Sequence, residues 1–114
     1  MRKGKMVSQG AHASLAAVLS CRSHELEVGS RVVIEPTVAM RSWLDQDFTK
    51  IVVGVNSEEE LVAIHQQALE ADIPCSLIRD LARTEFSSPT LTACAVGPAL
   101  PEEIDPITRH LPLL

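Results

Sequence analysis

The 114-residue sequence has few of the residues that build cross-linked, metal-bound or membrane-spanning proteins. Its three cysteines are odd in number and no C-x-x-C pair occurs, which argues against a disulfide framework or a structural zinc site. No stretch approaches the roughly 18 uncharged apolar residues of a membrane-spanning helix. We therefore expect a cytoplasmic protein with reduced thiols, no metal and no membrane partner.

Acidic residues are missing from the start of the chain. Residues 1–24 contain four basic residues, Arg2, Lys3, Lys5 and Arg22, whereas the remainder holds six basic and fifteen acidic residues. A polyanion could meet the first segment and avoid the rest of the surface. Charge alone leaves open the alternative that this basic cluster only faces solvent.

Hydrophobic periodicity predicts helices along most of the chain. Val7, Ala11, Leu15, Val18 and Leu19 form a helical stripe, which predicts a helix over about residues 5–21. Small residues in it, Gly10, Ala13 and Ala16, would permit close packing on a sheet. Three further helices are predicted: one capped by Thr37 and running to about Leu44, one opened by the capping box Ser57-x-x-Glu60, and one after Pro101.

Three segments carry strand signals. Ile51–Val55 is a β-branched run of the kind found in strands buried on both faces, and Cys75–Ile78 and Leu91–Val96 are shorter candidates. The segment 31–35 reads equally as a strand or a covered loop. The first two strands flank a helix, which predicts a parallel crossover, and the last two should be antiparallel. The expected class is α/β, a single domain with a mixed parallel/antiparallel sheet of three to four strands and helices on both faces.

Two groups of polar residues are candidates for chemistry. Lys3 and Lys5 stand at a helix start, where free N–H groups and the helix dipole favour an anion, and Gln9 and His12 share one face of the same helix. Such a histidine is more often a packed residue than a catalyst, and a K-G-K triplet is common. The remaining histidines, read as surface residues, are His24, His65 and His110.

The second group follows the strand that ends near Ile78. Its members are Arg79, Asp80, Arg83 and Thr84, with the hydroxyls of Thr90 and Thr92 close behind in the sequence. Ligands of open α/β sheets lie beyond the carboxyl ends of strands, so this group could form a crevice. The arginines could instead pair with nearby acids. No G-x-S-x-G, Walker A, G-x-G-x-x-G or H-E-x-x-H pattern occurs.

Taken in order, these pieces resemble one family. The segments R-K-G-K-M-V-S-Q-G-A-H-A-S, K-I-V-V-G-V-N-S-E-E-E-L, I-P-C-S-L-I-R-D with R-T-E-F, P-T-L-T, A-V-G-P and I-D-P-I-T-R-H-L-P-L-L are similar to those of the type-2 peptidyl-tRNA hydrolases. Each is weak alone, but six in matching order over nearly the whole chain are specific. The resemblance implies hydrolysis of the ester between a peptide and the 3′ ribose of tRNA. It also implies that the enzyme has no cofactor, and family members are often homodimers.

The resemblance also implies site residues. The catalytic positions fall on Lys5, His12, Asp80 and Thr84. It also places Gln9 in the active site, with Thr90 and Thr92 nearby. With the basic residues that could hold phosphates, the expected substrate-binding set is Arg2, Lys3, Gln9, Arg79, Arg83, Thr90 and Thr92. Ester hydrolysis needs an activated water and a donor for the oxyanion. Asp80 could orient or deprotonate the water, directly or through Thr84, and Lys5 could hold the oxyanion or a phosphate.

Two departures from the family pattern affect these expectations. Members usually carry a strand of the form V-I-V-V-R-x-D-L before the K-G-K motif, so residues 1–114 are expected to form the domain without that strand. Ala82 stands where relatives commonly have glycine. Three functions therefore remain as hypotheses: an aminoacyl-tRNA hydrolase, a non-catalytic RNA- or protein-binding module on the same fold, and a small phosphate-binding α/β domain.

Overall fold

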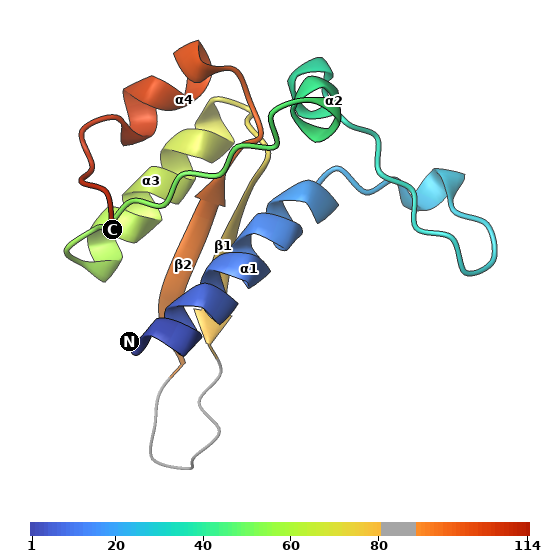
Figure 1. Ribbon diagram of the computed structural model, residues 1–114. Helices are drawn as coiled ribbons and strands as arrows, with labels where there is room; N and C mark the ends of the chain where they lie inside the picture. The colour runs from blue at the N-terminus through green and yellow to red at the C-terminus, as the bar shows by residue number, and fades with distance from the viewer. Residues whose placement is uncertain (81–88) are drawn as a thin grey trace.

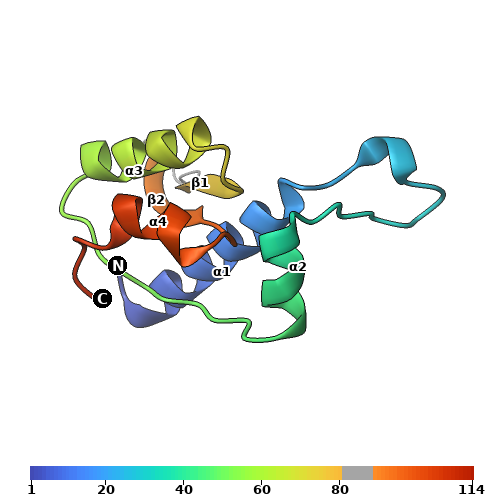
Figure 2. The same cartoon turned by 90° about the horizontal axis from the view of Figure 1, so that it is seen from above.

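A computed structural model describes residues 1–80 and 89–114. The elements are α1 (Lys3–Leu19), the 3-10 helix η1 (His24–Leu26), α2 (Val38–Asp45), α3 (Glu58–Glu70), β1 (Cys75–Asp80), β2 (Thr90–Val96) and α4 (Pro101–Thr108). Figure 1 and Figure 2 show α1 on one face of the two strands and α3 on the other, with α4 beside α3. None of the described helices is both long and apolar enough to cross a membrane.

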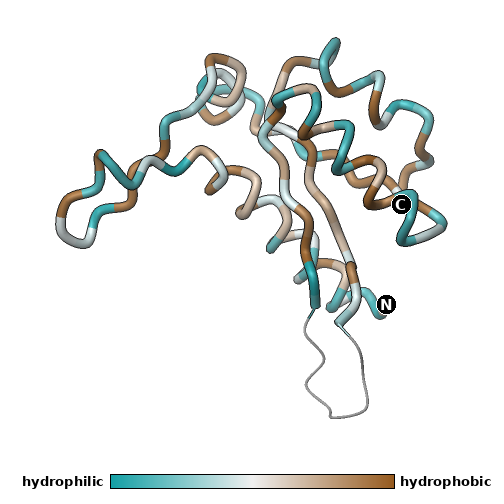
Figure 3. The backbone as a smooth tube through the Cα atoms, turned by 180° about the vertical axis from the view of Figure 1, so that it is seen from behind, coloured by the Kyte–Doolittle hydropathy of each residue, from teal (hydrophilic) through white to brown (hydrophobic). Residues whose placement is uncertain are grey.

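The core lies between the two strands and α3. Its buried members are Ile64, Ala68, Ile73, Cys75 and Ile107, with Val55, Cys94, Val96, Ala99 and Leu111 packed around them. All three cysteines are free thiols, and burial raises the pKa of Cys94 to about 11. Most of β2 is hydrophobic, whereas β1 ends in hydrophilic residues that lie near the N-terminal end of α1 (Figure 3).

The two strands form the antiparallel pair that the sequence predicts. Their register runs from Cys75 opposite Val96 to Asp80 opposite Thr90, with a shift between Ile78 and Arg79. Ile78 is opposite Ala93 and Arg79 is opposite Leu91, so one residue of β2, Thr92, has no partner. An extra residue of this kind is a β-bulge, which redirects the side chain it carries.

The predicted strand Ile51–Val55 does not form. Val53 makes one isolated bridge to Leu113, supported by Gly54 N donating to Pro112 O and Leu114 N donating to Val52 O. Ile51 and Val52, expected to be buried, are 72% and 62% exposed. A β-branched run needs a ladder on which to pack, and its hydrogen-bonded partner among the described residues is a short C-terminal tail. The predicted parallel crossover is therefore absent, and the described sheet has two strands.

Helix starts follow the predicted capping chemistry. Thr37 Oγ1 accepts from Met40 N at 3.0 Å at the start of α2. Ser57 Oγ accepts from Glu60 N at 3.1 Å at the start of α3, and Glu60 Oε1 accepts at 3.1 Å from the N–H of Asn56, the residue before this N-cap. Pro101 begins α4, as expected. These local signals fix three of the four helix starts.

Residues 21–36, here called the arm, project from the C-terminal end of α1 (Figure 1). The 31–35 segment is neither of the two expected forms: one bridge joins Arg22 to Ile34, and no regular strand results. Arg22 Nε donates to both carboxylate oxygens of Glu27 at 2.8–2.9 Å. This bond, with a second from Val33 N, lowers the pKa of Glu27 to about 2. The positive charge of Arg22 is therefore paired with Glu27 in the arm. Arg22 does not join the basic residues at the start of α1.

Candidate active site

One row of α1 faces the strands and sets the geometry of the site. Residues 5, 9, 13 and 17 recur at a spacing of four, which places them on one side of a helix. Gln9, Ala13 and Ala17 are the buried residues of α1, and Lys5 begins the row at the rim. The predicted packing of small residues on the sheet is confirmed for Ala13. The apolar stripe that includes Val7 and Leu15 faces solvent instead.

Lys5, at the N-terminal end of this row, contacts Asp80. Lys5 Nζ lies 2.8 Å from Asp80 Oδ2, and the two side chains are 50% and 34% exposed. Asp80 is the last residue of β1, and Lys5 lies in the first turn of α1, which has no acidic residue. A cation and a carboxylate therefore stand together where solvent and a substrate can reach both.

The next contact inward joins α1 to β2. Thr92 Oγ1 donates to Gln9 Oε1 at 2.5 Å, and Gln9 is 8% exposed. Strict alternation from Ala93, which pairs with Ile78 on the α1 face, would turn Thr92 toward α3. The bulge at Thr92 turns the hydroxyl back to α1. The sequence singled out both residues, but their contact depends on this irregular register.

Ser76 makes a third contact, which sequence reasoning missed. Its buried hydroxyl donates to the carbonyl oxygen of Ala13 at 2.6 Å. A strand hydroxyl that bonds to a helix backbone fixes the height of the helix above the sheet. It thereby holds Lys5, two turns earlier in α1, beside Asp80. No local pattern in the sequence signals such a contact.

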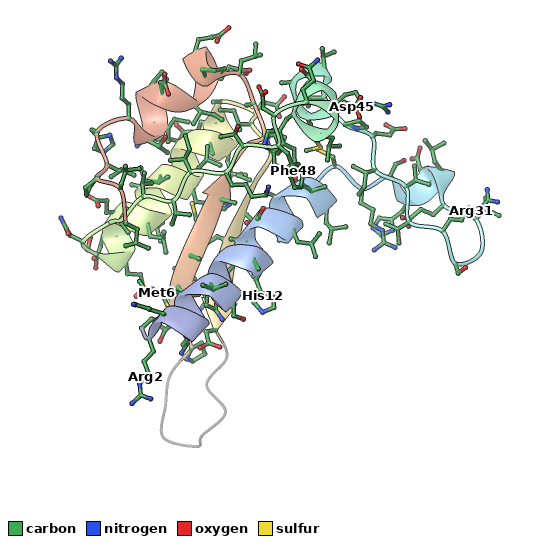
Figure 4. All side chains as sticks on the ribbon, viewed as in Figure 1. Arg2, Met6, His12, Arg31, Asp45 and Phe48 are labelled. Atoms are coloured by element: carbon green, nitrogen blue, oxygen red, sulfur yellow. The ribbon has the colours of Figure 1, made fainter. Side chains whose placement is uncertain are left out.

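The structure places the other predicted site residues at different positions around the Lys5–Asp80 pair. Thr90 is opposite Asp80 in the register, and Arg2 and Lys3 are exposed at the start of α1, with Arg2 projecting outward in Figure 4. Arg79 is exposed, and by alternation it points to the other face of the strands from Asp80. His12 is exposed and projects to the opposite side of α1 from Met6 (Figure 4). Arg83 and Thr84 lie outside the described residues.

The described part of this region offers no ligand set for a metal ion. Across residues 1–80 and 89–114, no group of three or more His, Cys, Asp or Glu side chains is placed to hold a metal ion. What the described residues offer is a carboxylate that can accept a proton, a primary ammonium that can face an oxyanion, and hydroxyls nearby. That combination suits hydrolysis of an ester by water.

Comparison with known proteins gives consistent matches over the whole chain. The family model described as "Peptidyl-tRNA hydrolase PTH2" matches residues 1–114. The chain is 43% identical over its full length to a peptidyl-tRNA hydrolase of Methanocaldococcus jannaschii, of which 90% is covered. It is 40% identical over its full length to one of Methanococcus maripaludis, with 89% covered. It is 37% identical to a probable peptidyl-tRNA hydrolase 2 of Drosophila melanogaster, with 55% of that protein covered.

Proposed function

The chain belongs to the PTH2 family of peptidyl-tRNA hydrolases, and we propose that it cleaves the ester bond between a peptide or N-blocked aminoacyl group and the 3′ ribose of tRNA. The reaction is a carboxylic ester hydrolysis by water. The observation that carries the assignment of residues is the Lys5–Asp80 contact, 2.8 Å long at an accessible rim. It joins a potential base to a potential oxyanion partner 75 positions apart in the sequence.

Asp80 acts on the attacking water. Its carboxylate accepts a proton from the water as the oxygen adds to the ester carbonyl carbon. When the tetrahedral intermediate collapses, the bond to the 3′ oxygen breaks and that oxygen takes the proton as tRNA leaves. Thr84 assists Asp80 in this proposal, as the family resemblance implies, and Thr90 lies opposite Asp80 in the register.

Lys5 stabilises negative charge. The first turn of α1 has N–H groups without partners inside the helix and the positive end of the helix dipole, which add to the ammonium charge. Lys5 therefore suits either the oxyanion of the intermediate or the terminal phosphate of the tRNA. Gln9 and Thr92 position α1 against β2. In this proposal the exposed His12 contacts the ribose or the peptide carbonyl of the substrate.

The nucleic acid meets the basic end of α1. Arg2 and Lys3 are exposed there and have no acidic neighbour in the first turn. In this proposal Arg79, the second-last residue of β1, and Arg83 add positive charge. A tRNA phosphate backbone is the anion that such a cluster would bind. A substrate of this kind belongs to translation, so we also propose a cytoplasmic location.

The finer architecture expected from the sequence also remains part of the proposal. Residues 1–114 act as one domain, two copies associate, and the working sheet is a mixed one of three to four strands. Each described strand has a single hydrogen-bonded neighbour, and the β-branched residues Ile51 and Val52 are exposed. Exposed apolar residues with strand composition and a sheet with open edges both favour pairing with a further strand.

Release of free tRNA from an N-acetyl-aminoacyl-tRNA tests the function. Asp80→Asn keeps the shape but removes the charge and basicity, so turnover should fall by roughly 10²–10⁴-fold, the usual contribution of a general base. Its affinity for tRNA should hold or rise slightly, because one negative charge is gone. Lys5→Ala should lower both turnover and affinity, since a lysine there meets an anion in the ground and transition states.

The control is a chain that carries the family segment V-I-V-V-R-x-D-L ahead of Met1, assayed beside the chain as given. Absence of hydrolysis above buffer by both wild-type forms would reject the enzyme. Full activity of Asp80→Asn would leave the reaction in place and remove Asp80 from its role.

A further inference from the structure

The row of α1 that faces the strands has small side chains at its centre. We call Lys5, Gln9, Ala13 and Ala17 the inner row. Ala13 is 2% and Ala17 is 1% exposed, so their methyl groups pack fully against the rest of the chain. A helix keeps its position along its own axis when large side chains interdigitate with those of its neighbours. Two methyl groups allow a close approach, but they offer little resistance to sliding.

The hydroxyl of Ser76 supplies the restraint that the alanines lack. Ser76 is the second residue of β1 and is 8% exposed, and its Oγ donates to Ala13 O at 2.6 Å. Both atoms are held close to the backbone, so neither can follow a movement of the helix. A hydroxyl hydrogen bond is normally no longer than about 3.0 Å, so sliding α1 by about 2 Å would break this one.

The distances from this bond to the site agree along α1 and along β1. Ser76 and Asp80 are four residues apart in β1, so they lie on the same face and about 13 Å apart. Ala13 and Lys5 are eight residues apart in α1, which is about 12 Å along the helix axis. Joining Ser76 to Ala13 therefore brings Lys5 level with Asp80, at the end of the strands where Figure 1 shows the N-terminal end of α1.

Gln9 and Thr92 restrain the same helix less strictly. Thr92 Oγ1 donates to Gln9 Oε1, an acceptor at the end of a side chain with several rotatable bonds. Rotation about those bonds lets the amide follow a small movement of α1 and keep its partner. The carbonyl that Ser76 contacts belongs to the helix backbone and has no such freedom. The Ser76 bond is therefore the stricter restraint on the position of α1 along its axis.

We propose that Ser76 is a positioning residue for the hydrolysis, which fixes α1 along its axis and thereby sets the separation of Lys5 from Asp80. The inference rests on the proposed function, and Ser76 itself is buried and touches no substrate. A misplacement of about 1 Å can cost about 100-fold in rate. Removing the hydroxyl should therefore lower kcat. KM should hold, because Arg2 and Lys3 meet phosphates through long, exposed side chains.

Steady-state release of tRNA from an N-acetyl-aminoacyl-tRNA tests the proposal. Ser76→Ala should lower kcat by roughly 10-fold or more and leave KM within about twofold of wild type. Ser20→Ala is the matched control. Ser20 Oγ also donates to a carbonyl of α1, Ala17 O at 2.6 Å, but from the end of the helix itself and not from a strand. Its loss should leave both constants within about twofold of wild type.

A double variant separates positioning from a general loss of structure. In a Lys5→Ala background the position of α1 no longer sets a contact with Asp80, so adding Ser76→Ala should change kcat by less than about threefold. A structural loss would multiply with the first one. Ser76→Cys offers a weaker donor at nearly the same size, and its kcat should fall between those of wild type and Ser76→Ala. It also carries the test if circular dichroism shows that Ser76→Ala is unfolded.

Crystal structures of wild type and Ser76→Ala give a readout that needs no activity. Without the hydroxyl, α1 should lie displaced along β1 by about 1 Å or more, the scale that matters for catalysis. The contact of 2.8 Å between Lys5 Nζ and Asp80 Oδ2 should lengthen. The comparison is made within one crystal form, so that lattice contacts are the same in both.

The outcomes distinguish this inference from the proposed function. Absence of hydrolysis by wild type rejects the proposed function, and the positioning role falls with it. If wild type is active, an unchanged kcat for folded Ser76→Ala, or losses that multiply in the double variant, overturn the positioning role alone. A rise in KM at constant kcat does the same, because it would place Ser76 in binding. An α1 that does not move in the crystal also overturns the positioning role.

Discussion

The two faces of α1 differ in a way that the hydrophobicity of the helix does not reveal. The inner row has small or polar side chains and makes three polar contacts, Lys5 to Asp80, Gln9 to Thr92 and Ser76 to the Ala13 carbonyl. The side of α1 turned away from the strands, called the outer face, has the larger apolar residues, and Val7 and Leu15 on it are exposed. The docking of α1 on the strands therefore depends on the close approach of the helix and on these three polar contacts, and not on the apolar area that is buried.

The difference follows from what each face must do. Alanine permits the helix axis to approach the strands, and a close approach is needed for hydroxyls on the strands to reach the helix. Leucine or valine in the inner row would hold α1 further away. The Lys5–Asp80 contact depends on that approach, since Lys5 lies on the same row as Ala13. The packing of the inner row therefore also sets the geometry of the site.

The largest contrast should come from placing leucine on each face. Ala13→Leu inserts three carbon atoms where the side chain is 2% exposed, so the free energy of unfolding should fall by about 3 kcal/mol. Ala11→Leu makes the same change on the exposed side and should alter stability by no more than about 0.5 kcal/mol. Urea unfolding of both variants measures the difference. Equal losses would mean that the inner row is not the tightly packed face.

A smaller effect should follow from removing one hydroxyl. Thr92→Val leaves the buried Gln9 amide without its donor, which should cost about 1–2 kcal/mol of unfolding free energy. Gln9→Leu combined with Thr92→Val should cost less than the sum of the two single changes, because both partners are then apolar. The comparison is a double-mutant cycle by urea unfolding. Additive losses would show that the Gln9–Thr92 bond does not hold α1 to β2.

Local signals in the sequence were sufficient for the helices. Thr37 and Ser57 cap α2 and α3 as predicted, because a cap depends on residues within one turn. The stripe from Val7 to Leu19 correctly predicted a helix, but periodicity does not say which face of a helix is buried. The burial of Ala13 and Ala17 follows from their contact with strands more than 50 residues away.

Non-local pairing could not be predicted in the same way. The run Ile51–Val55 has the composition of a buried strand, but its bridge partner is Leu113 and no ladder forms among the described residues. The bulge at Thr92 is likewise a property of register between two strands. No residue type announces it, and without it the hydroxyl of Thr92 would turn from Gln9.

The site was partly accessible from the sequence, through the resemblance rather than through spacing. Lys5 and Asp80 were both expected in the site, and the structure brings them together. Nothing in their types predicts a meeting across 75 positions. Ser76 was missed because a serine in a strand is ordinary, and its role becomes visible only with the Ala13 carbonyl beside it.

The smallest effect concerns where RNA meets α1. If the basic end binds phosphates and the outer face does not, replacing both Arg2 and Lys3 by Ala should reduce the slope of log affinity against log salt by about one to two units, near 0.7–0.9 for each phosphate that is no longer neutralised. Val7→Gln, a neutral change on the outer face, should leave the slope unchanged. Titration of tRNA by fluorescence anisotropy at several salt concentrations gives both slopes. An affinity that does not vary with salt would remove the basic end of α1 as the binding surface, and a reduced slope for Val7→Gln would extend that surface along the helix.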